Sequence, residues 1–388
     1  MINDSTLPME GFPPNLLRKS YDEKINFVVE YFVDHQISRE VEKKIMSTIL
    51  SKSDISIIPV MGPTRIGKTT VLDFIENTIL KRNELEMEAD QSYMPVIRQT
   101  ASANETGFFD FKDHYIRLLN VIKEPLIYKS VKVTDETYEN LKMDRYGLPG
   151  NVERNTLRVY RSRLESCFIH RRTQVYVIDE APDMATASKR NRVKDTMQVI
   201  KSICENTGVK IILSGTYDLT TMLYRSGQLA ARSCKPIHFR PYSHGSLSTE
   251  DYENFLAILR TYEVIMPLEK EPDFVNLYDY FWEKTLGCMG ILKNWLILAY
   301  EETLKNKNKT ILEKTLKICE PDHSTLITLI REIKSGEQFL HENDHKSIWT
   351  EMGINLQQNQ SILPGKKRHS KRKPGIRNPE RDPVSSNR

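Results

Sequence analysis

Cysteine is scarce in this 388-residue chain, and long apolar runs are missing from it. The five cysteines are scattered, with no C-x-x-C pair, so neither a disulfide framework nor a cysteine-based metal site is predicted. No apolar run reaches the ~18 residues of a membrane span, and residues 1–4 do not resemble the basic start of a signal peptide. We therefore expect a cytoplasmic protein that has no contact with a membrane.

A strong excess of either charge is also missing from most of the chain, although the net charge is +4. The basic character lies in residues 365–388, where nine Lys or Arg stand against two acidic residues. We expect residues 341–388 to be a flexible tail, polar and then basic. Three roles remain open: a solubilising tail, unspecific attraction to polyanions, or an arm that binds DNA or an acidic partner.

A phosphate-loop motif is the most specific feature present. Residues 62–69 match the pattern G-x-x-x-x-G-K-[ST] at every fixed position, between an apolar run and a helical pattern. A loop that leads from a strand into a helix directs backbone N–H groups at one point, where polyphosphate binds. We therefore predict that ATP is bound by Gly62, Pro63, Thr64, Arg65, Ile66, Gly67, Lys68, Thr69 and Thr70.

Apolar segments of strand length alternate with helical patterns over residues 21–240. Strands are predicted at 55–61, 93–99, 175–178 and 209–213, and helices at 21–51 (with a break near His35), 70–80, 108–121, 156–169 and 193–204. This alternation predicts an α/β fold with a parallel sheet and helices on both faces. Residues 1–20, with three prolines, are expected to be an irregular arm, and residues 241–340 a small helical domain.

A second motif lies at the end of the predicted strand at 175–178, which Asp179 and Glu180 follow directly. Such a strand end resembles a Walker B motif. Asp179 would hold Mg²⁺ together with the Thr69 hydroxyl, and Glu180 would polarise the attacking water. Lys68 would reach the β- and γ-phosphates. The alternative is an ordinary solvated turn at Asp179 and Glu180.

Polar residues after the next strand extend the predicted site. Thr216 or Ser214 would sense the γ-phosphate or orient the water, unless the segment is only a turn. Arg225 and Arg232 lie seven residues apart, and either would be an arginine finger offered to a neighbouring subunit, with Arg232 preferred. Their alternative is a surface position without function.

The order of these motifs resembles the AAA+ transposition regulators TnsC and TniB over about residues 24–302. The resemblance is carried by Gly-Pro-Thr-x-x-Gly-Lys-Thr-Thr, Ile-Asp-Glu-Ala, Ser-Gly-Thr, Gln-Leu-x-x-Arg, a strand ending at Phe239 and the acidic helix that follows. It implies an AAA+ P-loop ATPase with a helical lid, within a bacterial, nucleoid-associated protein. It also implies a homo-oligomeric ring or filament on duplex DNA, with transposase subunits and a TniQ or TnsD type target selector, sometimes CRISPR-associated, as partners.

One position departs from that family. Its members often have an arginine directly after the glycine of a lid helix, as a γ-phosphate sensor, whereas Ile291 follows Gly290 here. Lys293 is a possible substitute. By position, the resemblance offers Lys112, Thr156 and Arg158 as DNA contacts, although each is also explained as a plain solvated residue.

Other functions on the same core remain open at this point. The chain could use ATP as structural glue between subunits and hydrolyse it slowly, or it could be a small-molecule kinase or a replication-initiation ATPase. A replication initiator of this kind would have a C-terminal winged helix, which the polar tail does not favour.

Overall fold

The computed structural model describes residues 11–102, 109–123, 157–186, 192–224, 231–345 and 352. Its contacts divide the chain into two units, Met1–Lys334 and Ser335–Arg388. All contacts given below lie within the first unit. Most of the predicted tail, residues 341–388, lies outside the described residues, as do the first ten residues of the predicted arm.

A parallel sheet of five strands forms the centre of the first unit, in the order β2-β3-β4-β1-β5. Every pairing in it is parallel, as predicted. Its strands are β1 Ile57–Met61, β2 Val96–Thr100, β3 Val175–Asp179, β4 Lys210–Gly215 and β5 Ile237–His238. Since β1 and β3 are buried along their whole length, both faces of the sheet must be covered.

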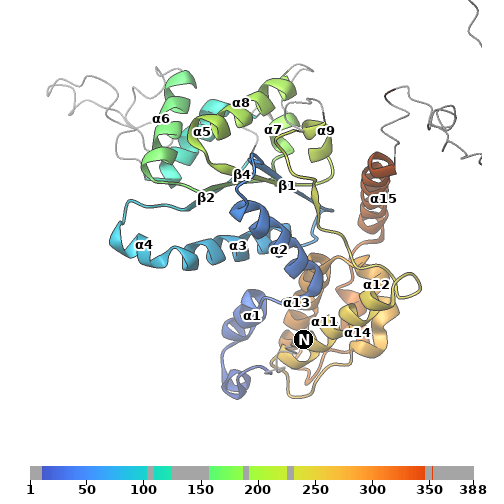
Figure 1. The fold of residues 1–388 in the computed structure, drawn as a ribbon. Coiled ribbons are helices and arrows are strands. Elements are labelled where there is room, and N and C mark those ends of the chain that lie inside the picture. The colour runs from blue at the N-terminus through green and yellow to red at the C-terminus, as the bar shows by residue number, and fades with distance from the viewer. Residues whose placement is uncertain are drawn as a thin grey trace, which may run out of the picture. The chain divides into compact units, whose positions relative to one another are not determined.

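Helices cover both faces of the sheet (Figure 1). One face carries α5 Phe111–Val121, α6 Leu157–His170 and α8 Arg192–Thr207, and the other carries α2 Gln36–Leu50 and α3 Lys68–Arg82. Helix α3 buries Val71, Leu72, Ile75 and Ile79, the spacing of an amphipathic helix. Three shorter helices complete this part: α4 Glu84–Ala89, α7 Asp183–Thr186 and α9 Leu219–Leu223.

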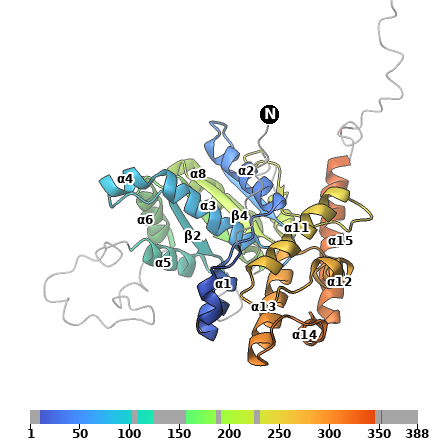
Figure 2. The ribbon, with the colours of Figure 1, turned by 90° about the horizontal axis from the view of Figure 1, so that it is seen from below.

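Residues 241–345 contain helices and no strand, in agreement with the sequence pattern. Figure 2 shows several of these helices gathered beside the sheet. They are α11 Thr249–Ile265, the 3-10 helix η5 Val275–Leu277, α12 Tyr278–Thr285, α13 Met289–Lys305, α14 Glu313–Ile318 and α15 His323–His345. Aromatic rings form much of their core, with 5.0 Å between the ring centroids of Phe281 and Trp295.

The segment before the sheet folds as two helices separated by a short linker, where the sequence predicted a break. After the 3-10 helix η1 Pro14–Arg18, helix α1 Tyr21–Glu30 begins with a capping box formed by Ser20 and Glu23, and it packs against α13. Helix α2 begins after His35, whose ring accepts the Ser38 N–H. The linker between them therefore runs beside the helical part, where it borders the pocket described below.

Two prolines explain details of the strands. Strand β2 begins only at Val96 because Pro95 has no N–H for the ladder, although its carbonyl accepts from Val175. Pro59 lies within β1, and the pairing on its β5 side consists of a bridge at Ile57 and a second contact that resumes at Val60. The missing donor of Pro59 thus falls in the interval between those pairings.

No helix in the described part of the chain is long and apolar enough to cross a membrane.

Candidate nucleotide site

Both fixed glycines of the phosphate loop are required by its geometry. Gly67 ends the loop with φ of 110°, a left-handed conformation that favours glycine, and α3 begins at the next residue. A Cβ on Gly62 would lie 2.3 Å from the carbonyl oxygen of Phe239, closer than any side chain permits. The loop therefore opens onto the start of α3, where the helix dipole and free N–H groups favour a polyphosphate.

Lys68, the first residue of α3, points back into the loop. Its Nζ donates to the carbonyl oxygens of Gly62 at 3.0 Å and Pro63 at 2.9 Å, and the residue is only 7% exposed. Burial lowers the pKa of Lys68, and the negative charges of Glu180 and Glu332 oppose that shift. Two neutral carbonyls compensate the positive charge of a buried ammonium group poorly. A negatively charged phosphate oxygen would bind Lys68 more strongly than these carbonyls do.

Thr69 and Asp179 meet although they lie 110 residues apart in sequence. The Thr69 hydroxyl donates to Asp179 Oδ2 at 3.2 Å, and Asp179 is buried at the carboxyl end of β3. A hydroxyl and a carboxylate are hard oxygen ligands of the type that Mg²⁺ prefers, together with water and phosphate oxygens. The pair thus fits the magnesium ion that accompanies a nucleotide.

Arg98 in β2 is a member of this site that the sequence analysis missed. Its guanidinium donates to Asp179 Oδ2 at 3.0 Å and also contacts Asp73 of α3. Side-chain exposure is 15% for Arg98 and 5% for Asp179. The only signal in the sequence is a charged residue inside the strand predicted at 93–99. Arg98 therefore fixes the carboxylate of Asp179 beside Thr69 and supplies its counter-charge.

Glu180 follows Asp179 in a strained backbone conformation. Its φ is 51°, which is uncommon for a residue with a side chain and is often found at functional sites. Its N–H donates to Asp179 Oδ1 at 3.1 Å, which ties the two acidic residues together. Desolvation raises the pKa of the Glu180 carboxyl, while the charge of Lys68 opposes this. A carboxylate with a raised pKa is suited to accept a proton from water.

Strand β4 brings the predicted sensor residues to the same edge of the sheet, since the Gly62 N–H donates to the carbonyl of Gly215 at 3.3 Å. Ser214 is fully buried, and its hydroxyl has no hydrogen-bond partner in the described part of the chain. Thr216 lies beyond the strand end, partly exposed, with its hydroxyl 3.4 Å from Asp218 Oδ2. Of the two, Thr216 is the one that a nucleotide could reach.

Arg232, the preferred arginine finger, is not part of this cluster. The backbone carbonyl of Arg232 accepts the N–H groups of Ser56 and Ile57 at the amino end of β1, and its guanidinium forms an ion pair with Glu205 at 2.8 Å. The length of β1, about 13 Å at 3.3 Å per residue, separates that position from the phosphate loop. Arg225 lies outside the described residues. Arg232 therefore cannot serve the nucleotide site of its own chain and would need a neighbouring subunit.

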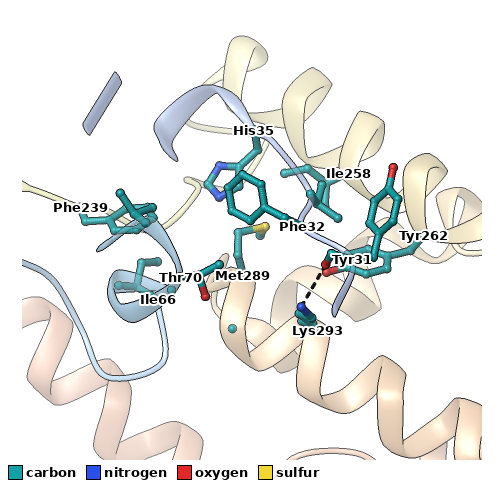
Figure 3. Close-up of a pocket in the computed structure, with 14 residues that line it drawn as sticks. Tyr31, Phe32, His35, Ile66, Thr70, Phe239, Ile258, Tyr262, Met289 and Lys293 are labelled. Atoms are coloured by element: carbon teal, nitrogen blue, oxygen red, sulfur yellow. Dashed lines mark hydrogen bonds between the residues drawn. The ribbon is translucent and has the colours of Figure 1, made fainter. Parts of the chain in front are cut away.

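A pocket adjoins the phosphate loop (Figure 3). Its walls come from the linker before α2, the loop and start of α3, the end of β5 and helices α11 and α13. Most lining side chains are apolar or aromatic, as is usual for a pocket that takes a flat organic group. They include Tyr31, Phe32, His35, Ile66, Phe239, Ile258, Tyr262 and Met289. Sequence analysis missed this pocket because its walls come from separate segments.

Lys293 lines the same pocket, but its ammonium group is engaged elsewhere. Its Nζ donates to the carbonyl oxygens of Val29 at 2.6 Å and Tyr31 at 3.0 Å, as the dashed line to Tyr31 in Figure 3 shows. Gly290, three residues earlier, lies against the loop, because a Cβ there would be 2.4 Å from the Arg65 carbonyl oxygen. Helix α13 thus touches the phosphate loop through its backbone at Gly290, while its Lys293 side chain binds the linker between α1 and α2.

The structure describes two of the three predicted DNA contacts, Lys112 and Arg158. Lys112 is half-buried in the first turn of α5, with its Nζ 5.8 Å from the ring centroid of Tyr160. Arg158 is exposed in the first turn of α6, which packs against α5. Thr156 lies outside the described residues. Their role in DNA binding stays a prediction.

Comparison with known proteins agrees with the fold. Residues 52–223 match the family model described as AAA domain. Together with the parallel sheet and the loop at residues 62–69, this match defines an AAA-type P-loop ATPase domain. No curated protein sequence matches the chain significantly.

Several solved structures are similar to this chain at low identity. The Walker-type ATPase PABY2304 of Pyrococcus abyssi is 16% identical, with a TM-score of 0.45, covering 76% of this chain and 75% of that one. The ORC2 protein of Aeropyrum pernix is 10% identical, with a TM-score of 0.48 and coverages of 76% and 71%. The ORC1 protein of the same organism, in complex with DNA, is 16% identical, with a TM-score of 0.48 and coverages of 76% and 68%.

Proposed function

We propose that this chain is a Mg²⁺-dependent ATPase that assembles on duplex DNA and regulates transposition. The observation that carries the ATPase part is the contact of the Thr69 hydroxyl with Asp179, beside the Lys68 ammonium group and next to Glu180. These are the groups that would hold the metal, bind the terminal phosphates and polarise water. They come from the start of α3 and the carboxyl end of β3, which meet at one edge of the sheet.

The apolar pocket supports adenine as the base of the nucleotide. It begins at Gly67 and Thr70, so a phosphate chain in the loop leads directly into it. Aromatic and apolar walls from His35, Phe239 and Tyr262 suit a flat, weakly polar ring. Since the linker and the lid helices both line this pocket, bound nucleotide would hold them together.

The DNA and transposition parts rest on the order of motifs that resembles TnsC and TniB. In such a protein a ring or filament on duplex DNA would link a TniQ or TnsD type selector to transposase subunits. If Arg232 is an arginine finger, its place at the far end of β1 requires the nucleotide of a neighbouring copy, which an assembled ring or filament would supply. ATP hydrolysis would then dismantle the assembly.

A second candidate, an ATP-bound scaffold with little turnover, is favoured by one observation. The only proposed substitute for the lid sensor is Lys293, and its ammonium group is bound to the carbonyls of Val29 and Tyr31. With that group engaged, transition-state charge on the γ-phosphate would be less well compensated. Nucleotide would still connect the lid to the core in such a protein.

Phosphate release, measured with Mg²⁺ and ATP in the presence and absence of duplex DNA, separates the two functions. The ATPase predicts DNA-stimulated release that falls about 100-fold or more in Glu180→Gln, since a positioned general base contributes roughly that much. Glu88→Gln on α4 is the matched control, because it is exposed and lies beyond the far end of α3, about 22 Å of helix from the loop. DNA-bound assembly without any phosphate release would contradict the ATPase and support the scaffold.

A further inference from the structure

A carboxylate from the last helix of the first unit already occupies the mouth of the phosphate loop. Glu332 in α15 accepts the Thr64 N–H at 3.1 Å, and both of its oxygens accept from the Thr64 hydroxyl at 3.3 Å. The two residues lie 268 positions apart in sequence. A backbone N–H and a hydroxyl that converge on one anion make the kind of contact that a phosphate oxygen would otherwise receive.

Glu332 lies on the Lys68 side of the loop, because the Lys68 Nζ donates to the carbonyls of the two residues directly before Thr64, and neither Thr64 nor Glu332 lines the apolar pocket. Glu332 and Glu180 both act on the Lys68 ammonium group, in opposition to the effect of its burial. Lys68 is the group that reaches the β- and γ-phosphates, and Glu180 would lie beside the attacking water. The carboxylate of Glu332 is therefore near the place of the terminal phosphate, away from the apolar pocket for the base.

Glu332 is held there by a packed helix. Leu326 and Leu329 of α15 are buried, and Ile333 packs against the main hydrophobic core. Its helix therefore presents the carboxylate from a fixed backbone position, so the contact is not that of a freely moving chain end. Two residues later the first unit ends at Lys334.

We propose that Glu332 is a resident competitor of the γ-phosphate, which sets the selectivity of the site between ATP and ADP. This inference rests on the proposed ATP site. A diphosphate would use the N–H groups at the start of α3 and leave the Thr64 contact intact. A triphosphate would bring a second anion next to Glu332, so the carboxylate must leave before ATP is fully bound.

Competition of this kind reduces the apparent affinity by the fraction of molecules in which the contact is open. The ion–dipole contact is partly solvated, so we expect an effect of about five-fold for ATP. For ADP the expected change is less than about two-fold. The ratio of ATP affinity to ADP affinity is thus the quantity that reports on Glu332.

Calorimetric titration of the full-length protein with ATP and with ADP, in the presence of Mg²⁺, tests this. Glu332→Gln should bind ATP about five-fold more tightly than the wild type and ADP almost unchanged, whereas the control Glu88→Gln should change neither. Glu332→Asp keeps the charge but shortens the side chain, so it should also favour ATP. Should Glu332→Gln fail to fold, Glu332→Asp carries the same test.

The outcomes are distinct. Equal tightening of ATP and ADP in Glu332→Gln, with no change in Glu332→Asp, would show a general charge effect and overturn the proposal. An unchanged ATP-to-ADP ratio in both variants would overturn it as well, while leaving the ATP site standing. If the wild type binds neither nucleotide, the proposed function fails together with this inference.

Discussion

At the scale of single residues, the site depends on charges that compensate one another in a dry environment. Asp179 is buried and receives donors from Thr69 and Arg98, while Lys68 is buried against neutral carbonyls. Removing one partner of such a buried pair costs much more than removing a surface charge. The structure offers a direct comparison between the two situations.

Arg98→Met should lower the free energy of unfolding by about 2 kcal/mol, because it leaves the Asp179 carboxylate buried with only the Thr69 hydroxyl as a side-chain donor. The matched control is Arg39→Met, which removes an exposed ion pair with Asp34 at 3.5 Å, with side-chain exposures of 58% and 38%. We expect less than about 0.5 kcal/mol for the control. Urea denaturation measures both, and equal effects would show that the Arg98 pair is no more than a surface contact.

Acidic pH should destabilise the protein through its buried histidines. Burial, assisted by Arg39, lowers the pKa of His35 to about 4, and burial lowers that of His114 to about 3. In the unfolded chain these histidines have a pKa near 6.5, so between pH 6.5 and pH 4 they bind protons that they do not bind in the native state. Stability contributed by each histidine is therefore complete above pH 6.5 and falls as the pH drops toward 4.

His35→Asn isolates one of these groups, since Asn can still cap α2 but does not titrate. Between pH 7 and pH 5 the wild type should lose about 2 kcal/mol more unfolding free energy than this variant does. Denaturation midpoints in urea at the two pH values provide the measurement. Parallel losses in wild type and variant would mean that His35 is protonated in the native state at pH 5.

At the scale of elements, local sequence patterns predicted most of the fold. The strands at 55–61 and 209–213 agree with β1 and β4 to within two residues, because apolar runs between turn signals specify buried strands. The short helix α4, Glu84–Ala89, was missed because six residues carry too little periodicity. The start of β2 was displaced because Pro95 removes a ladder donor that the apolar pattern does not reveal.

The contact between helix α13 and the phosphate loop leaves no room for an added methyl group at Gly290. Gly290→Ala should gain up to about 1 kcal/mol in helix propensity, yet its Cβ would meet the Arg65 carbonyl, at a cost of about 1–3 kcal/mol. We therefore expect a lower melting temperature and weaker ATP binding. Gly11→Ala, whose Cβ would make only ordinary contacts from 3.4 Å, is the control. A higher melting temperature for Gly290→Ala would contradict this packing.

At the scale of the whole molecule, the parts of the site that sequence could not predict are those joined across long separations. The motif residues Lys68, Thr69, Asp179 and Glu180 could be assigned because their spacing follows a known pattern. Arg98 and Glu332 could not, since neither stands in a motif and their partners are fixed only by folding. Lys293 was predicted as a γ-phosphate sensor from its place after Gly290. Its ammonium group instead donates to the backbone carbonyls of Val29 and Tyr31.

The central claim is that ATP in this site drives assembly on DNA, and electron microscopy with duplex DNA and a non-hydrolysable ATP analogue tests it most directly. The wild type and the control Lys81→Ala, an exposed residue in the last turn of α3, should form rings or filaments that depend on the nucleotide. Lys68→Ala should form none. Identical assemblies without nucleotide, or with Lys68→Ala, would contradict the account.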